Sequence, residues 1–160
     1  MEVLAYEGPD GELTLRPSVE TLAPFFDMGP DYWQGGSGSA YIGWIKERSP
    51  GYSTRFDRPV LHIIFHEPYG VCLTYEVVSY QPGVPGMALM TYNDLVAGDL
   101  LVEHYLGGEA AYLPRRSFVR KEAAVRVAAA FLQTQKPSAE VMWRPRRGLE
   151  YAGYGYVRGR

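Results

Sequence analysis

Apolar side chains recur every three to four positions within residues 119–143, which is the spacing of one face of an α-helix. Four of them share a single stripe: Ala124, Val127, Ala128 and Phe131. Glu122 and Arg126 lie opposite this stripe at i and i+4, where an ion pair contributes only a few tenths of a kcal/mol. Packing of the stripe must therefore supply most of the helix's stability, and the helix needs a sheet to lie on. A proline turn and a strand ending at Trp143 follow it.

The strongest strand pattern surrounds Glu67-Pro68-Tyr69-Gly70, where two runs rich in branched and aromatic residues predict a central β-hairpin. Because successive strand residues point to opposite faces, the first run has two different sides. Leu61, Ile63 and Phe65 share the side expected beneath the helix. The other side carries four residues: Val60, His62, Ile64 and His66.

Shorter patterns complete an α+β fold with no βαβ alternation. Residues 2–17 predict a hairpin around Pro9-Asp10-Gly11, and Ser18 is placed to cap a short helix that Pro24 would break or kink. Residues 27–39 read as a glycine-rich loop, and further strands are expected at 40–47, 86–92, 99–106 and 109–114. The expected architecture is an antiparallel sheet packed on one face by the late amphipathic helix, with a C-terminal edge strand. Residues 1–143 form one domain and residues 144–160 a basic tail rich in Tyr, Gly and Arg.

Charge is unevenly distributed although the net charge is only −2. Residues 144–160 contain five arginines and one acidic residue, whereas residues 1–143 contain 11 basic and 17 acidic residues. An acidic body favours basic partners and disfavours nucleic acid. No apolar run approaches the ~20 residues of a membrane span and no signal peptide is evident, so we expect a cytoplasmic protein with no membrane partner. The single cysteine, Cys72, is expected to be a small buried hydrophobe.

Candidate catalytic and metal-binding patterns are weak, and we expect no enzyme activity, cofactor, metal or small-molecule ligand. His62 and His66 would lie roughly 13 Å apart along a strand, which is too far to share one zinc ion. Ser37 lacks the spacing of a nucleophile elbow, and no phosphate-binding glycine motif follows a strand. Carboxylates crowd residues 92–109, either as solvated strand ends or as a site for acid–base chemistry. A small hydrolase or metal enzyme is therefore an alternative.

The tail allows another alternative, a small nucleic-acid-binding module. It interleaves arginines with Tyr151, Tyr154 and Tyr156, a composition suited to phosphate contact and base stacking. The competing interpretation is a flexible or loosely docked tail beside an acidic body, and on that interpretation nucleic acid is not a partner.

The later part of the chain carries a block of residues with a recognisable order. A Gly-x-Leu-x-Tyr-like strand is followed by a tyrosine-containing strand, a glycine turn, a proline-bounded segment, an alanine-rich helix ending in Phe, a proline turn and a strand with Trp. The residues are Gly70, Val71, Leu73, Tyr75, Tyr105, Gly107, Gly108, Pro114, Ala124, Phe131, Thr134, Pro137, Val141 and Trp143. Over residues 60–143 this block resembles the first-numbered family of immunity proteins from bacterial polymorphic toxin systems. Gln135 stands where glycine is common in that family, and residues 1–55 and the tail have no counterpart.

The resemblance implies a small α+β immunity protein for interbacterial competition, which binds and neutralises a cognate toxin by occluding its active site. Toxins encoded beside such proteins often belong to nucleic-acid deaminase families, so the expected partner is a toxin domain of that kind. The block itself reads as a folding core, so the binding surface is sought in loops and strand ends where aromatics stand near carboxylates. The expected toxin-binding residues are Tyr32, Trp33, Tyr92, Asp94, Asp99 and Glu103. Two alternatives are open: Trp33 folds back to close the core, or the sheet face with His62 and His66 meets the toxin.

Overall fold

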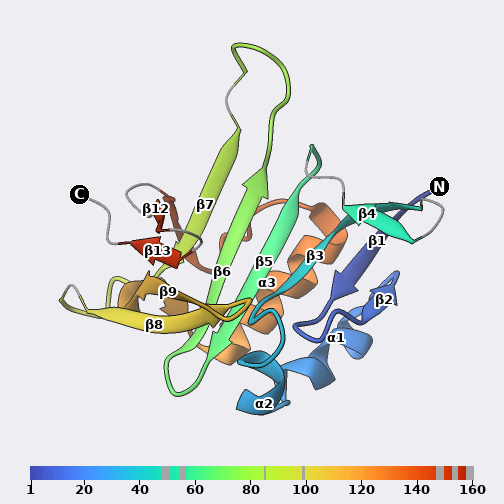
Figure 1. The fold of residues 1–160 in the computed structure, drawn as a ribbon. Helices are drawn as coiled ribbons and strands as arrows, with labels where there is room; N and C mark the ends of the chain where they lie inside the picture. The colour runs from blue at the N-terminus through green and yellow to red at the C-terminus, as the bar shows by residue number, and fades with distance from the viewer. Residues whose placement is uncertain are drawn as a thin grey trace.

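The computed structural model describes residues 1–47, 51–54, 57–84, 86–98, 100–146, 150–152 and 155–157. Its main feature is a nine-stranded antiparallel sheet in which seven strands follow the order β11-β7-β6-β5-β3-β1-β2, while β10 pairs with β6 and β4 with β3 (Figure 1). The strands are β1 (Glu2–Glu7), β2 (Leu13–Leu15), β3 (Ala40–Glu47), β4 (Tyr52–Thr54), β5 (Val60–His66), β6 (Gly70–Val77), β7 (Met87–Tyr92), β10 (Phe118–Val119) and β11 (Met142–Pro145). The fold is α+β, as the sequence predicts.

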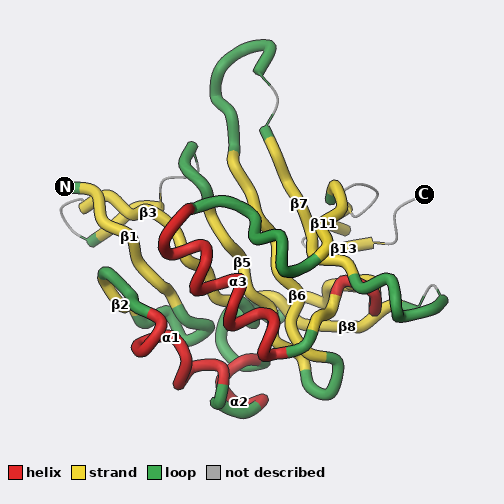
Figure 2. Tube along the Cα trace, turned by 180° about the vertical axis from the view of Figure 1, so that it is seen from behind, coloured by secondary structure: helices red, strands yellow, loops and turns green. Residues whose placement is uncertain are grey.

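One face of the sheet is covered by helices α1 (Val19–Phe26), α2 (Pro30–Trp33) and α3 (Lys121–Thr134) (Figure 2). The predicted stripe of α3 is confirmed, because all four of its residues are buried. The predicted sheet partners Leu61, Ile63 and Phe65 belong to the same buried cluster. We call this side the helix face. The predicted ion pair within α3 is not the one formed, since the Arg126 guanidinium instead bonds the Glu140 carboxylate at 2.5 Å.

The N-terminal region follows the predicted order of hairpin and helix. β1 and β2 pair around the Pro9-Asp10-Gly11 turn, and the Ser18 side chain accepts a hydrogen bond from the Thr21 N–H to cap α1. Pro24 lies inside this eight-residue helix and does not end it. The helix ends at Phe26, two residues later, so the break expected at Pro24 is not observed.

The other face of the sheet, which we call the open face, is partly covered by a separate hairpin of β8 (Leu101–Leu106) and β9 (Glu109–Pro114). These strands were expected within the main sheet, but they form a two-stranded layer across it (Figure 1). Alternation explains the layer, since Val102, His104, Ala111 and Leu113 are buried and their neighbours Glu103, Tyr105 and Tyr112 are exposed. The buried side packs against residues that include Ile64 and Cys72.

β6 pairs with two different strands along its length, and one threonine completes the hydrogen bonding where the partner strand changes. Residues 74–77 pair with β7, whereas Val71 and Cys72 pair with β10, which follows the 3₁₀ turn η1 (Arg115–Ser117). At the junction the Leu73 N–H donates to the Thr91 hydroxyl at 3.0 Å, and that hydroxyl donates to the Ser117 carbonyl at 2.7 Å. Thr91 is 1% exposed, so its side chain replaces a missing backbone partner inside the core.

The C-terminal strand β11 pairs with β7 at the sheet edge, as predicted, and extends two residues beyond Trp143. In the predicted tail, β12 (Glu150–Ala152) and β13 (Gly155–Val157) pair with each other. The rest of residues 147–160 lies outside the described residues. Within the described part of the chain, no helix combines the length and the apolar character needed to cross a membrane.

Candidate interaction surface

The structure places Tyr32 and Trp33 in α2 and not in an open loop. Trp33 is 1% exposed, its Nε1–H donates to the Phe25 carbonyl at 2.8 Å, and its ring lies 5.7 Å from that of Phe65. Tyr32 is half-buried and its hydroxyl lies 3.0 Å from that of Tyr6. The prediction that Trp33 is an exposed contact residue is therefore wrong, and the alternative, in which Trp33 closes the core, is observed. Two features of the sequence indicated this helix and its burial. Pro30 suits a first helical position, and the apolar Phe26, whose ring packs near that of Trp33, lies shortly before it.

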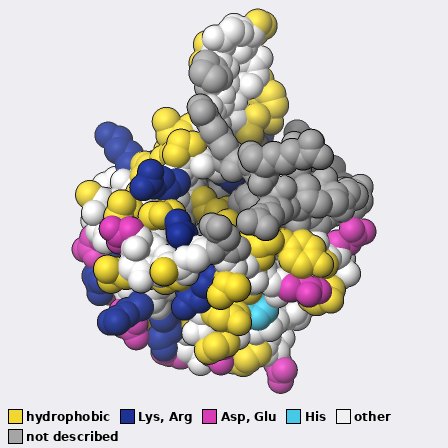
Figure 3. Space-filling model, turned by 90° about the vertical axis from the view of Figure 1, so that its left-hand side faces the viewer, with side chains coloured by type: hydrophobic (Ala, Val, Ile, Leu, Met, Phe, Trp, Pro, Cys, Tyr) yellow, Lys and Arg dark blue, Asp and Glu magenta, His cyan; other side chains and the backbone are white. Residues whose placement is uncertain are grey.

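Tyr92 lies at the end of β7 among cations. The Arg144 guanidinium is 4.6 Å above its ring and an Arg116 Nη1–H donates to its hydroxyl at 3.2 Å. A second Arg116 donor, Nε–H, bonds the Gly98 carbonyl at 2.9 Å and so ties the following loop to this point. Lys and Arg side chains gather on this side of the molecule (Figure 3). The sequence predicted a negative surface here, and the two arginines change that description.

The predicted carboxylates do not form one cluster with the α2 aromatics. Asp94 is exposed just after Tyr92, and Glu103 is exposed on β8, where it accepts a hydrogen bond from the Tyr105 hydroxyl at 2.8 Å. Asp99 lies outside the described residues. α2 packs on the helix face, whereas β8 crosses the open face (Figures 1 and 2). The five predicted residues that the structure describes therefore belong to different surfaces: Tyr32 and Trp33 adjoin in α2, Tyr92 and Asp94 lie at the end of β7, and Glu103 lies on β8.

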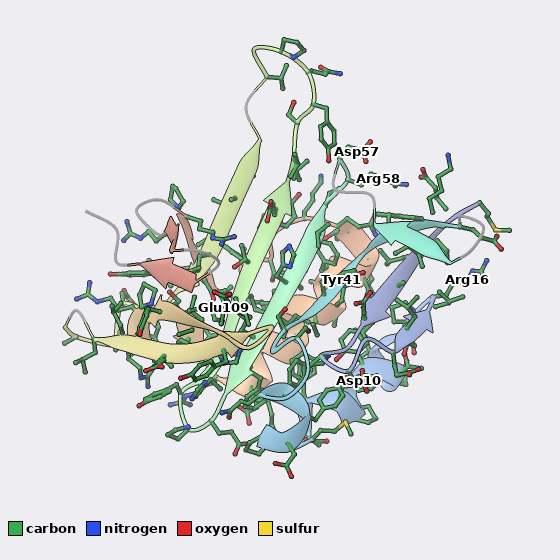
Figure 4. All side chains as sticks on the ribbon, in the orientation of Figure 1. Asp10, Arg16, Tyr41, Asp57, Arg58 and Glu109 are labelled. Atoms are coloured by element: carbon green, nitrogen blue, oxygen red, sulfur yellow. The ribbon has the colours of Figure 1, made fainter. Side chains whose placement is uncertain are left out.

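A row of polar side chains crosses the open face beyond the β8–β9 hairpin. The Tyr41 hydroxyl donates to the Glu7 carboxylate at 2.5 Å, and the Tyr41 and His62 rings lie 6.3 Å apart (Figure 4). His62 Nε2 then lies 3.5 Å from Glu76 Oε2, which is 4.0 Å from Arg146. The hydrogen bond with His62 is the main cause of a lowered pKa at Glu76; burial opposes it, and the charges of His62 and Arg146 assist it. This part of the face can present both signs of charge to a partner.

A small cavity beside this row is closed on one side by the hairpin. Its volume is about 110 Å³, and its lining includes His62, Glu76, Arg146 and Leu106. Ligand pockets for drug-sized molecules are roughly 300–1,000 Å³. The cavity suits a few water molecules, which agrees with its half-buried polar lining.

His66 pairs with His104 and not with His62. The two Nδ1 atoms are 2.9 Å apart, and His104 Nε2 lies 2.6 Å from the Gly38 carbonyl oxygen. Because a carbonyl only accepts, His104 Nε2 carries the proton and its Nδ1 accepts from His66 Nδ1–H. Burial lowers the pKa of both histidines, and the charge of His66 lowers that of His104 further. His104 thus fastens the β8–β9 hairpin to β5 through His66 and to the loop before β3 through Gly38, contacts that strand spacing alone could not reveal.

Among the described residues, no group of three or more His, Cys, Asp or Glu side chains is arranged to hold a metal ion. Cys72 is buried as predicted, and burial raises its thiol pKa to about 12, so it stays protonated at neutral pH.

The chain matches no protein-family model and no curated protein sequence.

Proposed function

We propose that the chain is a non-catalytic, cytoplasmic immunity protein that binds a cognate bacterial toxin domain and occludes its active site. The observation that carries the proposal is the ordered block over residues 60–143 that resembles the first-numbered family of immunity proteins. The expected toxin acts on nucleic acid, as a deaminase does. The argument is one of kinship and not of a catalytic geometry.

The block's residues have clear mechanical roles in the fold. The Tyr75 ring meets the Phe131 ring edge to face at 6.2 Å, and its hydroxyl donates to the Gln135 carbonyl at 3.2 Å. The Trp143 Nε1–H donates to the Ser138 carbonyl at 2.8 Å, which fixes the turn after α3. These contacts join β6, α3 and β11 into one unit. Such a unit supports the proposal as a framework that leaves the surface free to vary with the toxin.

The distribution of charge also supports a basic protein as partner. No lysine or arginine occurs between Arg58 and Arg115, a stretch that includes β5 to β9 and contains six acidic residues. Enzymes that act on nucleic acid carry basic grooves, which an acidic inhibitor meets quickly by electrostatic steering. Asp94, Asp99 and Glu103 belong to this stretch, and we keep them as steering groups.

The test is co-expression with the toxin domain encoded by the adjoining gene. We expect this chain to restore growth, and the purified protein to bind an inactivated form of that toxin with 1:1 stoichiometry in calorimetry. Charge reversal with Asp94→Lys and Asp99→Lys should slow association and weaken its salt dependence. The control is Glu12→Lys in the β1–β2 turn, an exposed site at the other side of the sheet. Absence of both binding and protection overturns the proposal, and salt-dependent binding to DNA or RNA that needs residues 147–160 would favour the nucleic-acid alternative.

A further inference from the structure

His66, His104 and the carbonyl of Gly38 form a contact that we call the clasp. His104 is 1% exposed, its Nε2–H donates to the Gly38 carbonyl at 2.6 Å, and its Nδ1 lies 2.9 Å from His66 Nδ1. Gly38 has φ +75°, and a Cβ there would lie 2.0 Å from the Tyr105 carbonyl oxygen, so glycine lets the loop approach β8 this closely. The clasp thus joins the loop before β3, the end of β5 and the middle of β8.

The clasp accepts one additional proton but not two. With both rings neutral, His66 Nδ1–H donates to His104 Nδ1, and His66 Nε2 has no partner among the described residues. A first proton on His66 Nε2 leaves both hydrogen bonds of the clasp in place. A second proton can bind only His104 Nδ1, where it faces the Nδ1–H of His66 across 2.9 Å. Two donors and two positive charges then meet, so double protonation breaks the clasp.

The described surroundings of the clasp do not neutralise two added charges. No carboxylate among the described residues forms an ion pair with either ring of the clasp, whereas His62 has Glu76. On β8, Glu103 and Tyr105 flank His104 but lie on the exposed side of the hairpin and bond each other. The other titratable or charged side chains on the elements around the clasp are Asp10, Glu67, Tyr69, Cys72, Arg115 and Arg120.

One of these neighbours adds positive charge. The Tyr69 ring lies 5.8 Å from the His66 ring, and the Arg115 guanidinium lies 5.0 Å from the centre of the Tyr69 ring. Asp10 accepts a hydrogen bond from the Glu12 N–H and so serves its own turn. A proton added to the clasp therefore meets repulsion and burial rather than a compensating carboxylate.

The β8–β9 hairpin covers the chain's single cysteine (Figure 1). Cys72 is 1% exposed and belongs to a buried cluster with Val102 of β8 and Leu113 of β9. This cluster is smaller than the one on the helix face, so lifting the hairpin exposes less apolar surface than unfolding the whole chain. Release of the hairpin uncovers the Cys72 thiol, whereas the three tryptophans lie on other elements: Trp33 on α2, Trp44 on β3 and Trp143 on β11.

We propose that the clasp is a proton-sensitive device that releases the β8–β9 hairpin from the open face when both histidines are protonated, while the main sheet and its helices stay folded. The lowered pKa of each ring, caused mainly by burial, sets the direction. The released rings bind protons more tightly than the closed clasp does, so the clasp is fully stable above the ordinary pKa of 6.5 and weakens as the pH falls below it. Release needs no toxin, so the device stands apart from the proposed function.

The experiment follows the reaction of Cys72 with 4,4′-dithiodipyridine in the wild type, in the double variant His66→Gln with His104→Gln, and in His62→Gln. His62 is the chain's third histidine and lies on the same face outside the clasp, which makes its substitution a matched control. Dividing each rate by that of the urea-unfolded protein at the same pH removes the pH dependence of the thiol chemistry and leaves the protection given by the hairpin. Tryptophan fluorescence reports whether the rest of the chain stays folded.

Between pH 7.5 and pH 5.0 we expect the protection of Cys72 to fall about tenfold or more in the wild type and in His62→Gln, and to change less than about twofold in the double variant. Tryptophan fluorescence should keep its folded value throughout. Protection should also depend only weakly on urea below the unfolding transition, because local release exposes little surface.

Three results would overturn the proposal. One is protection that does not change with pH in the wild type, and another is a fall that persists in the double variant. The third is a urea dependence as steep as that of global unfolding, which would show that the chain opens as a whole. If the double variant does not fold, His66→Gln decides: its clasp has one titratable ring, so the logarithm of protection should vary with pH about half as steeply as in the wild type, and an unchanged slope overturns the role of the pair.

Discussion

Replacing Thr91 by Val tests the junction at which β6 exchanges one neighbour for another. The substitution keeps the shape of the side chain and removes the hydroxyl that bonds both the Leu73 N–H and the Ser117 carbonyl. Both backbone groups then lack this partner at a site that is 1% exposed. Each buried polar group left unsatisfied costs about 1–3 kcal/mol, and the added methyl recovers part of this, so we expect a loss of about 2–4 kcal/mol in the free energy of unfolding.

The matched control is Thr74→Val on β6, where a threonine of similar burial, 6% exposed, lines the small cavity on the open face. Its expected cost is below about 1 kcal/mol. Urea denaturation followed by tryptophan fluorescence measures both variants against the wild type. Equal destabilisation by the two substitutions would refute the reasoning, because it would show that the hydroxyl of Thr91 contributes no more than any buried threonine.

Three further predictions concern stability and its dependence on pH. Gln135 caps the C-terminus of α3 with φ +49°, a conformation that suits glycine. Gln135→Gly should therefore raise the free energy of unfolding by up to about 1 kcal/mol, whereas Gln135→Ala should lower it. Thermal melting measures both variants. The folded pKa of Glu76 lies below its ordinary value of 4.5, so the ionised carboxylate stabilises the fold fully above pH 4.5, and this stabilisation is lost as the pH falls through the folded pKa. The difference in stability between the wild type and Glu76→Gln should therefore vanish at low pH in acid denaturation curves. The folded pKa of His104 is also lowered, so its neutral imidazole stabilises the fold fully above the ordinary pKa of 6.5, and this stabilisation falls at lower pH as the imidazole of the unfolded chain becomes protonated. In His104→Gln, the free energy of unfolding should therefore fall less between pH 7.5 and pH 5.5 than in the wild type.

Elements with a long and regular pattern could be predicted from the sequence. The stripe of α3 and the alternation in β5 specify both secondary structure and buried face, because each reports a periodic environment along one element. The central hairpin and the β1–β2 hairpin were likewise predictable, since both connect neighbours in the chain. The edge position of β11 followed from a strand placed after the covering helix.

Contacts between distant segments could not be predicted in this way. Alternation marks a buried side of β8 and β9, but it does not say whether they extend the sheet or lie across it. Trp33 sits among glycines that suggest a loop, yet its large apolar ring is removed from water by residues up to 32 positions away. The His66–His104 pair joins positions 38 residues apart, and the arginines around Tyr92 come from two other elements. The charge around the predicted site therefore depends on tertiary contacts, which a count of charged residues along the sequence does not include.

Each of the two outermost strands in the seven-strand order, β2 and β11, has an arginine–proline pair in or directly after its C-terminal end. β2 is three residues long and is followed by Arg16-Pro17, and β11 has four residues and finishes with Arg144-Pro145. A proline has no N–H to offer an incoming chain, and a charged neighbour is costly to cover, so short strands that end this way resist the addition of further strands. The sheet can thus keep these two edges in water at high protein concentration without growing into fibrils.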